Sequence, residues 1–262
     1  MSYLSRHVLG VSSLVIASTL CLLSESAMAW DLSWPFGAGV SGSGHVSRTQ
    51  RQVSAFKGVS LELPARVEIV QGEAEGLVIE ADDNIAPLIE TVVENEQLKI
   101  RVAQRFKSLK PTVLKLTLHV RALEQISIAG SGDVIAQKLQ SPTLEVRIAG
   151  SGDVRLAALQ TDSLSVSISG AGDFLAAGRA DSARYSIAGS GDLKTGSLAS
   201  KNVRISIAGS GDATVWASQT LNVSIAGSGD VGYYGDATLS QSVAGSGRIK
   251  KLGSAPAPGT AP

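Results

Sequence analysis

The sequence has one cysteine and three histidines among its 262 residues, and only 4% of the residues are aromatic. So few cysteines and histidines leave little basis for a disulfide scaffold or a Cys/His metal centre. Aromatic side chains are also too scarce for a broad surface on which bases or sugars would stack. Lys and Arg together number 23, as do Asp and Glu, so the formal net charge is zero. This balance argues against a nucleic-acid partner and against a polybasic membrane surface.

The first 29 residues have the pattern of a secretory signal peptide. A weakly basic start precedes an apolar stretch at residues 8–23, and a small-x-small motif ends at Ala29, the expected cleavage position. The apolar stretch is shorter than the roughly 20 residues that a transmembrane helix needs. Cys21 lies inside it, so cleavage leaves a chain without disulfides. We therefore expect secretion across the inner membrane to the periplasm or cell surface, with no transmembrane span after cleavage.

A short phrase, Gly-Ser-Gly-Asp, recurs through the second half of the chain. Its copies begin at Gly130, Gly150, Gly170 (as Gly-Ala-Gly-Asp), Gly189, Gly209, Gly227 and Gly245. The copies are 18 to 20 residues apart, a period typical of a solenoid whose coils bury their apolar faces against one another. Apolar and polar residues alternate before each copy, as in residues 164–168, which indicates strands. The sequence thus predicts an all-β fold, a parallel β-helix (β-solenoid) with two or three short strands per coil.

The chain divides into a signal peptide, an arm, one domain and a tail. The predicted boundaries are 1–29 for the signal peptide, 30–52 for a linker or N-terminal arm, 53–252 for the β-solenoid domain and 253–262 for a disordered tail. Within the domain, residues 53–120 are β-rich but irregular, and 121–252 carry the repeats. We expect the irregular part to cap the solenoid, because an uncapped β-helix leaves an open strand edge. One helical turn is predicted at residues 84–89.

Several stretches of the sequence resemble a bacterial protein family. They are the repeated Ile-Ala-Gly-Ser-Gly-Asp and the segments at residues 52–59, 68–72, 80–84 and 96–100. Over roughly residues 53–252 the pattern is similar to the family DUF2807, labelled a "putative autotransporter adhesin head, or GIN, domain". This resemblance implies an extracytoplasmic β-solenoid, and it implies no catalytic residues.

Six aspartates that end the repeated phrases are the first candidate site. They are Asp133, Asp153, Asp173, Asp192, Asp212 and Asp230, and in the seventh phrase Arg248 takes their place. We expect each Asp to cap its own corner, because Asp accepts hydrogen bonds from backbone N–H groups in turns. The alternative is a calcium column, since stacked coils would place the carboxylates about 4.8 Å apart and calcium takes oxygen ligands. The prediction is a structural role, with no metal and no cofactor.

Six serines are the second candidate site, a binding face. They are Ser127, Ser167, Ser186, Ser206, Ser224 and Ser242. Each occupies the outward position before the last apolar residue of its strand, so the hydroxyls should stack in a column that Arg147 interrupts. Val146, Val166, Ile205 and Val223, each two residues before the last apolar residue of its strand, should form one buried column with Tyr185 in the same register. Such a face would suit a glycan or another β-surface; the alternative is that Ser is simply a small, soluble strand residue.

These features predict a protein that is not an enzyme. Glycoside hydrolysis needs one distinct pair of carboxylates, whereas the six aspartates are equivalent. We expect an adhesin-like binding or structural module of the bacterial cell envelope, with an unidentified protein or glycan as partner. One alternative is an extracytoplasmic carbohydrate-active enzyme, which an asymmetric carboxylate pair in a cleft would reveal. The other is a calcium-dependent adhesion module, which chelator-sensitive stability would reveal.

Overall fold

The computed structural model describes residues 39–103, 108–253 and 256. The predicted signal peptide with its cleavage position at Ala29, and most of the predicted tail, lie outside these residues. All of the described residues belong to one compact unit. Among the described residues, no helix has the length and apolar character to cross a membrane.

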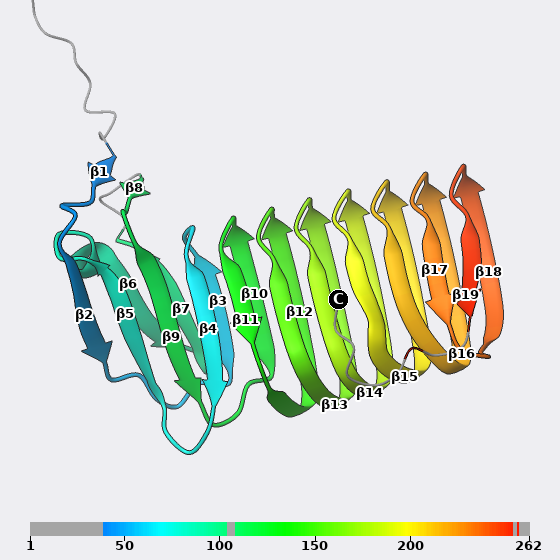
Figure 1. Ribbon diagram of the computed structural model, residues 1–262, viewed down its shortest axis with the longest axis horizontal. Helices are drawn as coiled ribbons and strands as arrows, with labels where there is room; N and C mark the ends of the chain where they lie inside the picture. Colours follow the sequence, from blue (N-terminus) through cyan, green and yellow to red (C-terminus); the bar gives the residue numbers. More distant parts are fainter. Residues whose placement is uncertain (1–38, 104–107, 254–255, 257–262) are drawn as a thin grey trace, which may run out of the picture. The chain divides into compact units, whose positions relative to one another are not determined.

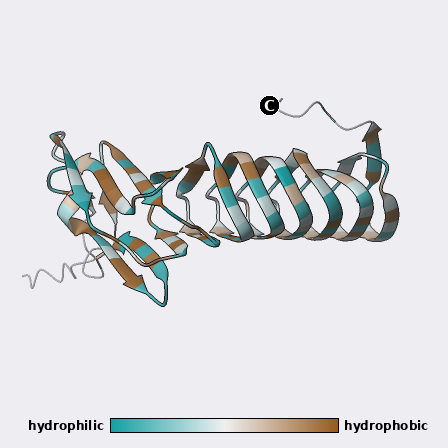
Figure 2. Ribbon diagram, turned by 90° about the horizontal axis from the view of Figure 1, so that it is seen from below, coloured by the Kyte–Doolittle hydropathy of each residue, from teal (hydrophilic) through white to brown (hydrophobic). Residues whose placement is uncertain are grey.

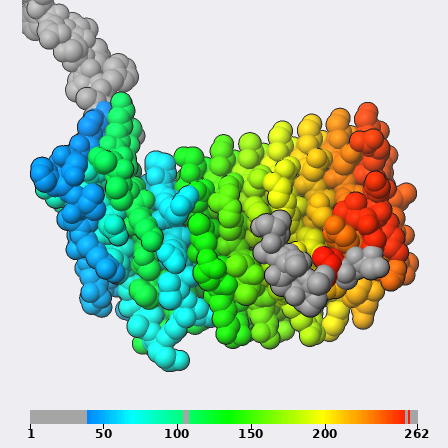
Figure 3. Space-filling model, viewed as in Figure 1, coloured from blue at the N-terminus to red at the C-terminus, as the bar shows by residue number. Residues whose placement is uncertain are grey.

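Residues 125–253 form parallel β-coils that stack in chain order, so that successive colours form adjacent bands in Figures 1 and 3. Their strands are β10 (Gln125–Gly130), β11 (Asp133–Ala136), β12 (Leu139–Gly150), β13 (Val154–Gly170), β14 (Phe174–Gly189), β15 (Leu193–Gly209), β16 (Ala213–Gly227), β17 (Val231–Tyr234), β18 (Thr238–Gly245) and β19 (Ile249–Gly253). The predicted β-solenoid is confirmed. In the central coils, however, one long strand bends around the coil and is interrupted only at the glycine-rich corner, in place of two or three separate strands.

The layers before the repeats are less regular. Their elements are β1 (Val40–Ser41), β2 (Val46–Arg51), β3 (Gly58–Glu62), β4 (Arg66–Gln71), β5 (Gly76–Asp82), the 3-10 helix η1 (Ala86–Leu88), β6 (Ile89–Glu94), β7 (Gln97–Val102), β8 (Leu109–Lys110) and β9 (Leu114–Val120). β3 and β4 pair in parallel with β10 and β11, and β7 and β9 extend the stack by one more parallel layer. The outermost strands β2, β5 and β6 are antiparallel to their neighbours. Parallel stacking therefore ends in this cap, and η1 lies in the predicted helical turn.

Strand β2 corrects the predicted linker at residues 30–52. It pairs antiparallel with β5 along its whole length, from Val46 opposite Asp82 to Arg51 opposite Leu77. The sequence does not reveal this strand because it is an edge strand with both faces largely exposed, so apolar and polar residues do not alternate along it. Arg51 fixes the strand further, because its guanidinium donates to the carbonyl oxygens of Ile89 and Ala86.

The coils align residue for residue on the strand segment before each corner. Val146, Val166, Tyr185, Ile205 and Val223 lie in one row of parallel partners, and all five are buried. The predicted register of the buried column is therefore confirmed. Figure 2 shows the result as hydrophobic and hydrophilic segments that alternate along the strands of the coils. Burial of this apolar row supplies stabilisation because each buried side chain contributes about 1.5–3 kcal/mol relative to its exposed state.

Differences in coil length are absorbed away from this row. Between β13 and β14 the register shifts after Leu156, and between β15 and β16 it shifts after Thr195 and again after Ser200. These shifts all come before the aligned segment that leads into the next corner. The corner and the strand segment before it keep their alignment from coil to coil, so side chains there form straight rows along the stack.

Both glycines of a central corner lie against the backbone of the preceding coil, as at Gly189, where a Cβ would lie 2.2 Å from the carbonyl oxygen of Gly170; the first glycine also has a positive φ. Gly189 has a φ of +137°, a conformation that side chains with a Cβ disfavour. Gly191 has no such φ, but a Cβ there would lie 2.2 Å from the carbonyl oxygen of Gly172 in the preceding coil. The second glycine is therefore required by the close approach of stacked backbones alone.

Candidate functional site

The six aspartates bridge consecutive coils. The Oδ1 atom of each Asp accepts a hydrogen bond of 2.8–3.3 Å from the backbone N–H of the aligned residue in the next coil. The expectation that each Asp caps its own corner is therefore corrected: the hydrogen bond reaches the corner that follows. The last Asp of the row, Asp230, accepts from the N–H of Arg248. A residue at position 248 has no further coil to bridge among the described residues, which accounts for the missing seventh Asp.

Basic side chains neutralise much of this row. Ion pairs join Arg155 to Asp153 at 2.7 Å, Lys194 to Asp173 at 3.1 Å and to Asp192 at 3.4 Å, and Arg248 to Asp230 at 2.7 Å. The hydrogen bond from Arg248 lowers the pKa of Asp230. In the part of the chain that the structure describes, no group of three or more His, Cys, Asp or Glu side chains is arranged to hold a metal ion. Backbone donors and cations thus meet the carboxylates directly.

Asp212 tests the bridging role most cleanly, because its Oδ1 accepts from the N–H of Asp230 at 2.8 Å and no ion pair with another described residue involves its carboxylate. Asp212→Asn should keep the hydrogen bond, since the amide oxygen is also an acceptor. Asp212→Leu should lose it and lower the free energy of unfolding by about 1 kcal/mol. Denaturant unfolding of both variants measures the free energy of unfolding, and thermal melts of both variants and the wild type, with and without calcium, measure the melting temperature. A calcium-dependent rise in the wild-type melting temperature that Asp212→Asn abolishes would instead make the row a metal site.

The serines form an outward surface, which we call the serine face: the exposed side chains of residues 143–150, 163–170, 182–189, 202–209, 220–227 and 238–245. The six predicted serines are aligned in one row of parallel partners, with Arg147 between Ser127 and Ser167. From Ser167 to Ser242 the row is exposed, whereas Ser127 is half-buried. A second exposed row, mostly alanine, runs beside it at Ala149, Ala188, Ala208 and Ala226. The surface near the corner is thus covered by small side chains.

One member of the serine row was not predicted. Ser60 of β3 is the parallel partner of Ser127, so the row continues into the first coil. Ser60 is buried and its hydroxyl donates to Glu62. The alternation at residues 59–61 was the available signal, but no glycine-rich phrase follows it to fix the register.

A polar hollow of about 410 Å³ lies on the serine face, at the start of the aligned segments. It is lined by Ser163, Leu164, Ser165, Ser182, Ala183, Arg184, Asn202, Val203, Arg204, Thr220 and Asn222. Arg184 and Arg204 are direct partners on neighbouring strands, with Ser165 and Asn222 as the next residues of the same row. Hydroxyl, amide and guanidinium donors therefore converge on one shallow surface.

A second hollow, of about 610 Å³, lies on the strand segment after the corner. Ile135, Leu175 and Tyr234 contribute its apolar lining, and Arg155 and Lys194 contribute polar edges. Both cations already pair with aspartates. The hollow is therefore an apolar surface whose charges are satisfied within the protein.

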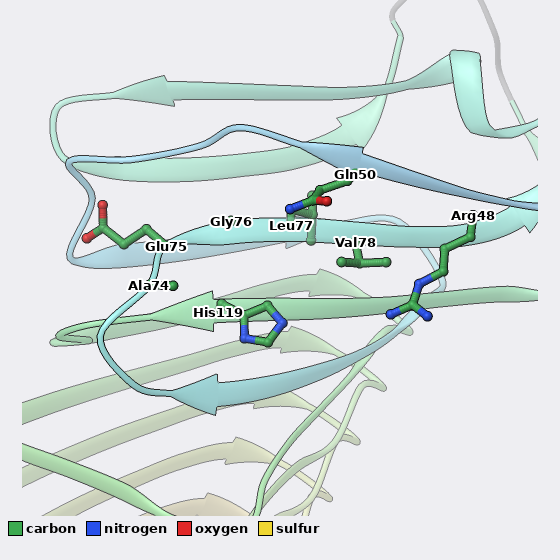
Figure 4. Close-up of a pocket in the computed structure, with 8 residues that line it drawn as sticks. All are labelled: Arg48, Gln50, Ala74, Glu75, Gly76, Leu77, Val78 and His119. Carbon is green, nitrogen blue, oxygen red and sulfur yellow. The ribbon is translucent and has the colours of Figure 1, made fainter.

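A third hollow lies on the cap and is shown in Figure 4. Arg48 and Gln50 of β2, Glu75, and His119 of β9 line it. No hydrogen bond or ion pair joins His119 to Arg48 or Glu75; Glu75 instead accepts from the backbone N–H of Ala55. Among the described residues, His119 therefore has no carboxylate partner that would orient it as a catalytic base.

Asp82 is a fully buried carboxylate in the cap. Its Oδ1 accepts from the N–H of Gly44 at 2.9 Å and its Oδ2 from the N–H of Thr112 at 2.8 Å. Burial opposes ionisation, but the backbone donors of Thr112 and Gly44 outweigh it and lower the pKa of Asp82. Asp82 fixes two loops of the cap and is not accessible to a ligand.

Comparison with solved structures gives the same fold. A "putative lipid binding protein" from Parabacteroides distasonis is 28% identical with a TM-score of 0.71, and a "putative adhesin" from Bacteroides fragilis is 27% identical with a TM-score of 0.77. Each alignment covers 82% of this chain and 100% of the other. A "putative adhesin" from Parabacteroides merdae, at 22% identity and a TM-score of 0.64, shares the fold. No curated protein matches the chain.

The family comparison covers most of the described residues. Residues 55–237, from the first coil through most of the repeats, match the family DUF2807, which is described as "Putative auto-transporter adhesin, head GIN domain". This family and the similar structures carry the names of adhesins or binding proteins, and none of these names is that of an enzyme. The match spans more than half of the sequence, and the chain therefore belongs to the DUF2807 family.

Proposed function

We propose that this protein is a secreted, non-enzymatic binding module of the bacterial cell envelope and that the serine face is its binding surface. The observation that carries the proposal is the row of exposed serines from Ser167 to Ser242, held in register over successive coils. Parallel stacking repeats the same hydroxyl about every 4.8 Å. A partner with regularly spaced hydrogen-bonding groups matches such a surface along its length.

The family and the similar structures support binding over catalysis. Two similar structures above 25% identity carry the names "putative adhesin" and "putative lipid binding protein". The carboxylates of the repeats each accept a hydrogen bond from a backbone N–H of the next coil, so each is already engaged within the protein. Glycoside hydrolysis needs two carboxylates in different environments, and none of the three hollows described above is lined by two carboxylates.

Bulky substitutions on the serine face test the proposal. Ser206 and Ser224 are exposed direct partners on β15 and β16. Ser206→Tyr combined with Ser224→Tyr should leave the strands intact, because Tyr favours strands. The two large side chains should, however, project from the row of small side chains and obstruct a partner that lies along it. We expect affinity for isolated bacterial envelopes to fall about tenfold or more, which corresponds to about 1.4 kcal/mol. Co-sedimentation of the purified protein with the envelopes measures this affinity.

The matched control places the same bulk on another surface. Gln140 and Gln160 are also exposed direct partners, on β12 and β13, outside the serine face. Gln140→Tyr with Gln160→Tyr should leave the affinity unchanged. Equal affinities for the serine variant and this control would contradict the proposal. A loss with Leu175→Glu alone would move the binding surface to the apolar hollow that Leu175 lines.

A further inference from the structure

Arg184 and Arg204 place two positive charges side by side on the serine face. They are direct partners on the parallel strands β14 and β15, so their backbones are about 4.8 Å apart. Both side chains are exposed. Like charges on neighbouring strand positions destabilise a sheet, and the direct neighbours of this pair in the row, Ser165 and Asn222, carry no charge.

Neither arginine has an acidic partner in the described part of the chain, in contrast to the cations along the aspartate row. Within the row of Arg184 and Arg204, the flanking residues are Ser165 and Asn222. The acid further along this row, Glu145, is paired with Arg147. The ten side-chain donors of the two guanidinium groups therefore face the polar hollow and the solvent.

We propose that this hollow binds an oxyanion group of an acidic polysaccharide, and that the guanidinium groups of Arg184 and Arg204 both contact this group. Arginine forms paired hydrogen bonds with planar or tetrahedral oxyanions, and two guanidinium groups on adjacent strands can hold one such group between them. This inference rests on the proposed function, because it names the ligand class of the serine face. It assigns the charged group of the ligand to Arg184 and Arg204, and its sugar hydroxyls to the neutral side chains around them.

The surroundings of the pair favour a polysaccharide over other polyanions. Ser165, Ser182 and Asn202 line the same hollow, and hydroxyl and amide groups both donate to and accept from sugar hydroxyls. A membrane surface would need apolar side chains or a larger basic cluster beside the pair. Nucleic acid would need a net positive charge over a broad surface, and the formal charge of this chain is zero.

Polygalacturonate, a polymer of uronic acid, is a suitable probe, with neutral dextran and phosphatidylglycerol vesicles for comparison. The full-length wild-type protein should bind polygalacturonate, and the binding should weaken with salt because exposed charges are screened. Arg184→Gln with Arg204→Gln should weaken it roughly a hundredfold, about tenfold for each charge-assisted contact. The charge control is Arg121→Gln with Arg179→Gln, which removes two positive charges from exposed positions outside the serine face, where Arg179 pairs with Asp181 and Arg121 donates to the carbonyl oxygen of Glu73. Its affinity should stay within about twofold of wild type.

Equal losses in the two arginine variants would show attraction by overall charge only and would overturn the inference. So would an absence of polygalacturonate binding, or tighter binding to the vesicles than to polygalacturonate. The proposed function is tested separately from this inference. If Ser206→Tyr with Ser224→Tyr abolishes envelope binding while the Arg184/Arg204 variant retains it, the serine face stands as the binding surface and only the anion site is wrong.

Discussion

Val166→Asp should unfold the coils around β13. Val166 is 2% exposed and lies between Val146 and Tyr185 in the buried row. A carboxylate at this position would be buried within the apolar core, and burial of an unpaired charge is strongly unfavourable. We expect a loss of about 4 kcal/mol or more in the free energy of unfolding, at the upper end of what single substitutions cause.

Ser167→Asp is the control, one residue further along the strand. Ser167 is exposed and its parallel partner on β12 is Arg147. A carboxylate there stays in water, so the change should be within about 0.5 kcal/mol. Denaturant unfolding followed by circular dichroism measures both variants. Equal destabilisation by the two substitutions would mean that the side chains of β13 do not alternate between core and solvent as the structure shows.

The repeats could be predicted in detail because one phrase fixes the register of every coil. Each glycine-rich phrase marks a corner, and the alternation before it assigns Val166 to the core and Ser167 to the surface. The cap could not be predicted in the same way. Its parallel layers β7 and β9 and antiparallel strands β2, β5 and β6 have no repeated phrase to align them. β2 is also polar on both faces, which removes the periodic signal.

The candidate sites show the same limit. Alternation was sufficient to place the serines on one face, but not to tell which coil each Asp contacts, because a hydrogen bond to the next coil depends on the three-dimensional stacking. Arg184 and Arg204 occupy equivalent positions in their repeats, so their alignment was present in the sequence. Their lack of acidic partners was not, since it depends on where the surrounding carboxylates lie. The repeat thus predicts rows of side chains, and the structure determines how the rows pair.

The corner glycines give a second large expected effect, with Gly191→Ala as the test. A Cβ at this position would lie 2.2 Å from the carbonyl oxygen of Gly172 and 2.9 Å from Cγ2 of Ile168. The first contact is with backbone that is held in the preceding coil, so a side-chain rotation cannot relieve it. Relief requires separation of the coils around the hydrogen bond between Asp192 and Asp173. We expect a loss of about 3 kcal/mol or more in the free energy of unfolding, at or above the usual cost of overpacking.

Two controls separate this clash from the general effect of replacing glycine or of changing the corner. Gly72→Ala makes the same chemical change where no atom lies within 4 Å of the added Cβ, so it should be neutral or slightly stabilising through the unfolded chain. Ser190→Ala changes the exposed residue between the two corner glycines, and Ala171 already occupies that position one coil earlier. Of the three variants, only Gly191→Ala should therefore have a free energy of unfolding far below that of the wild type. If Gly191→Ala matched Ser190→Ala, the backbones of successive corners would have to lie further apart than the structure places them, and the hydrogen bonds along the aspartate row would have to be longer as well.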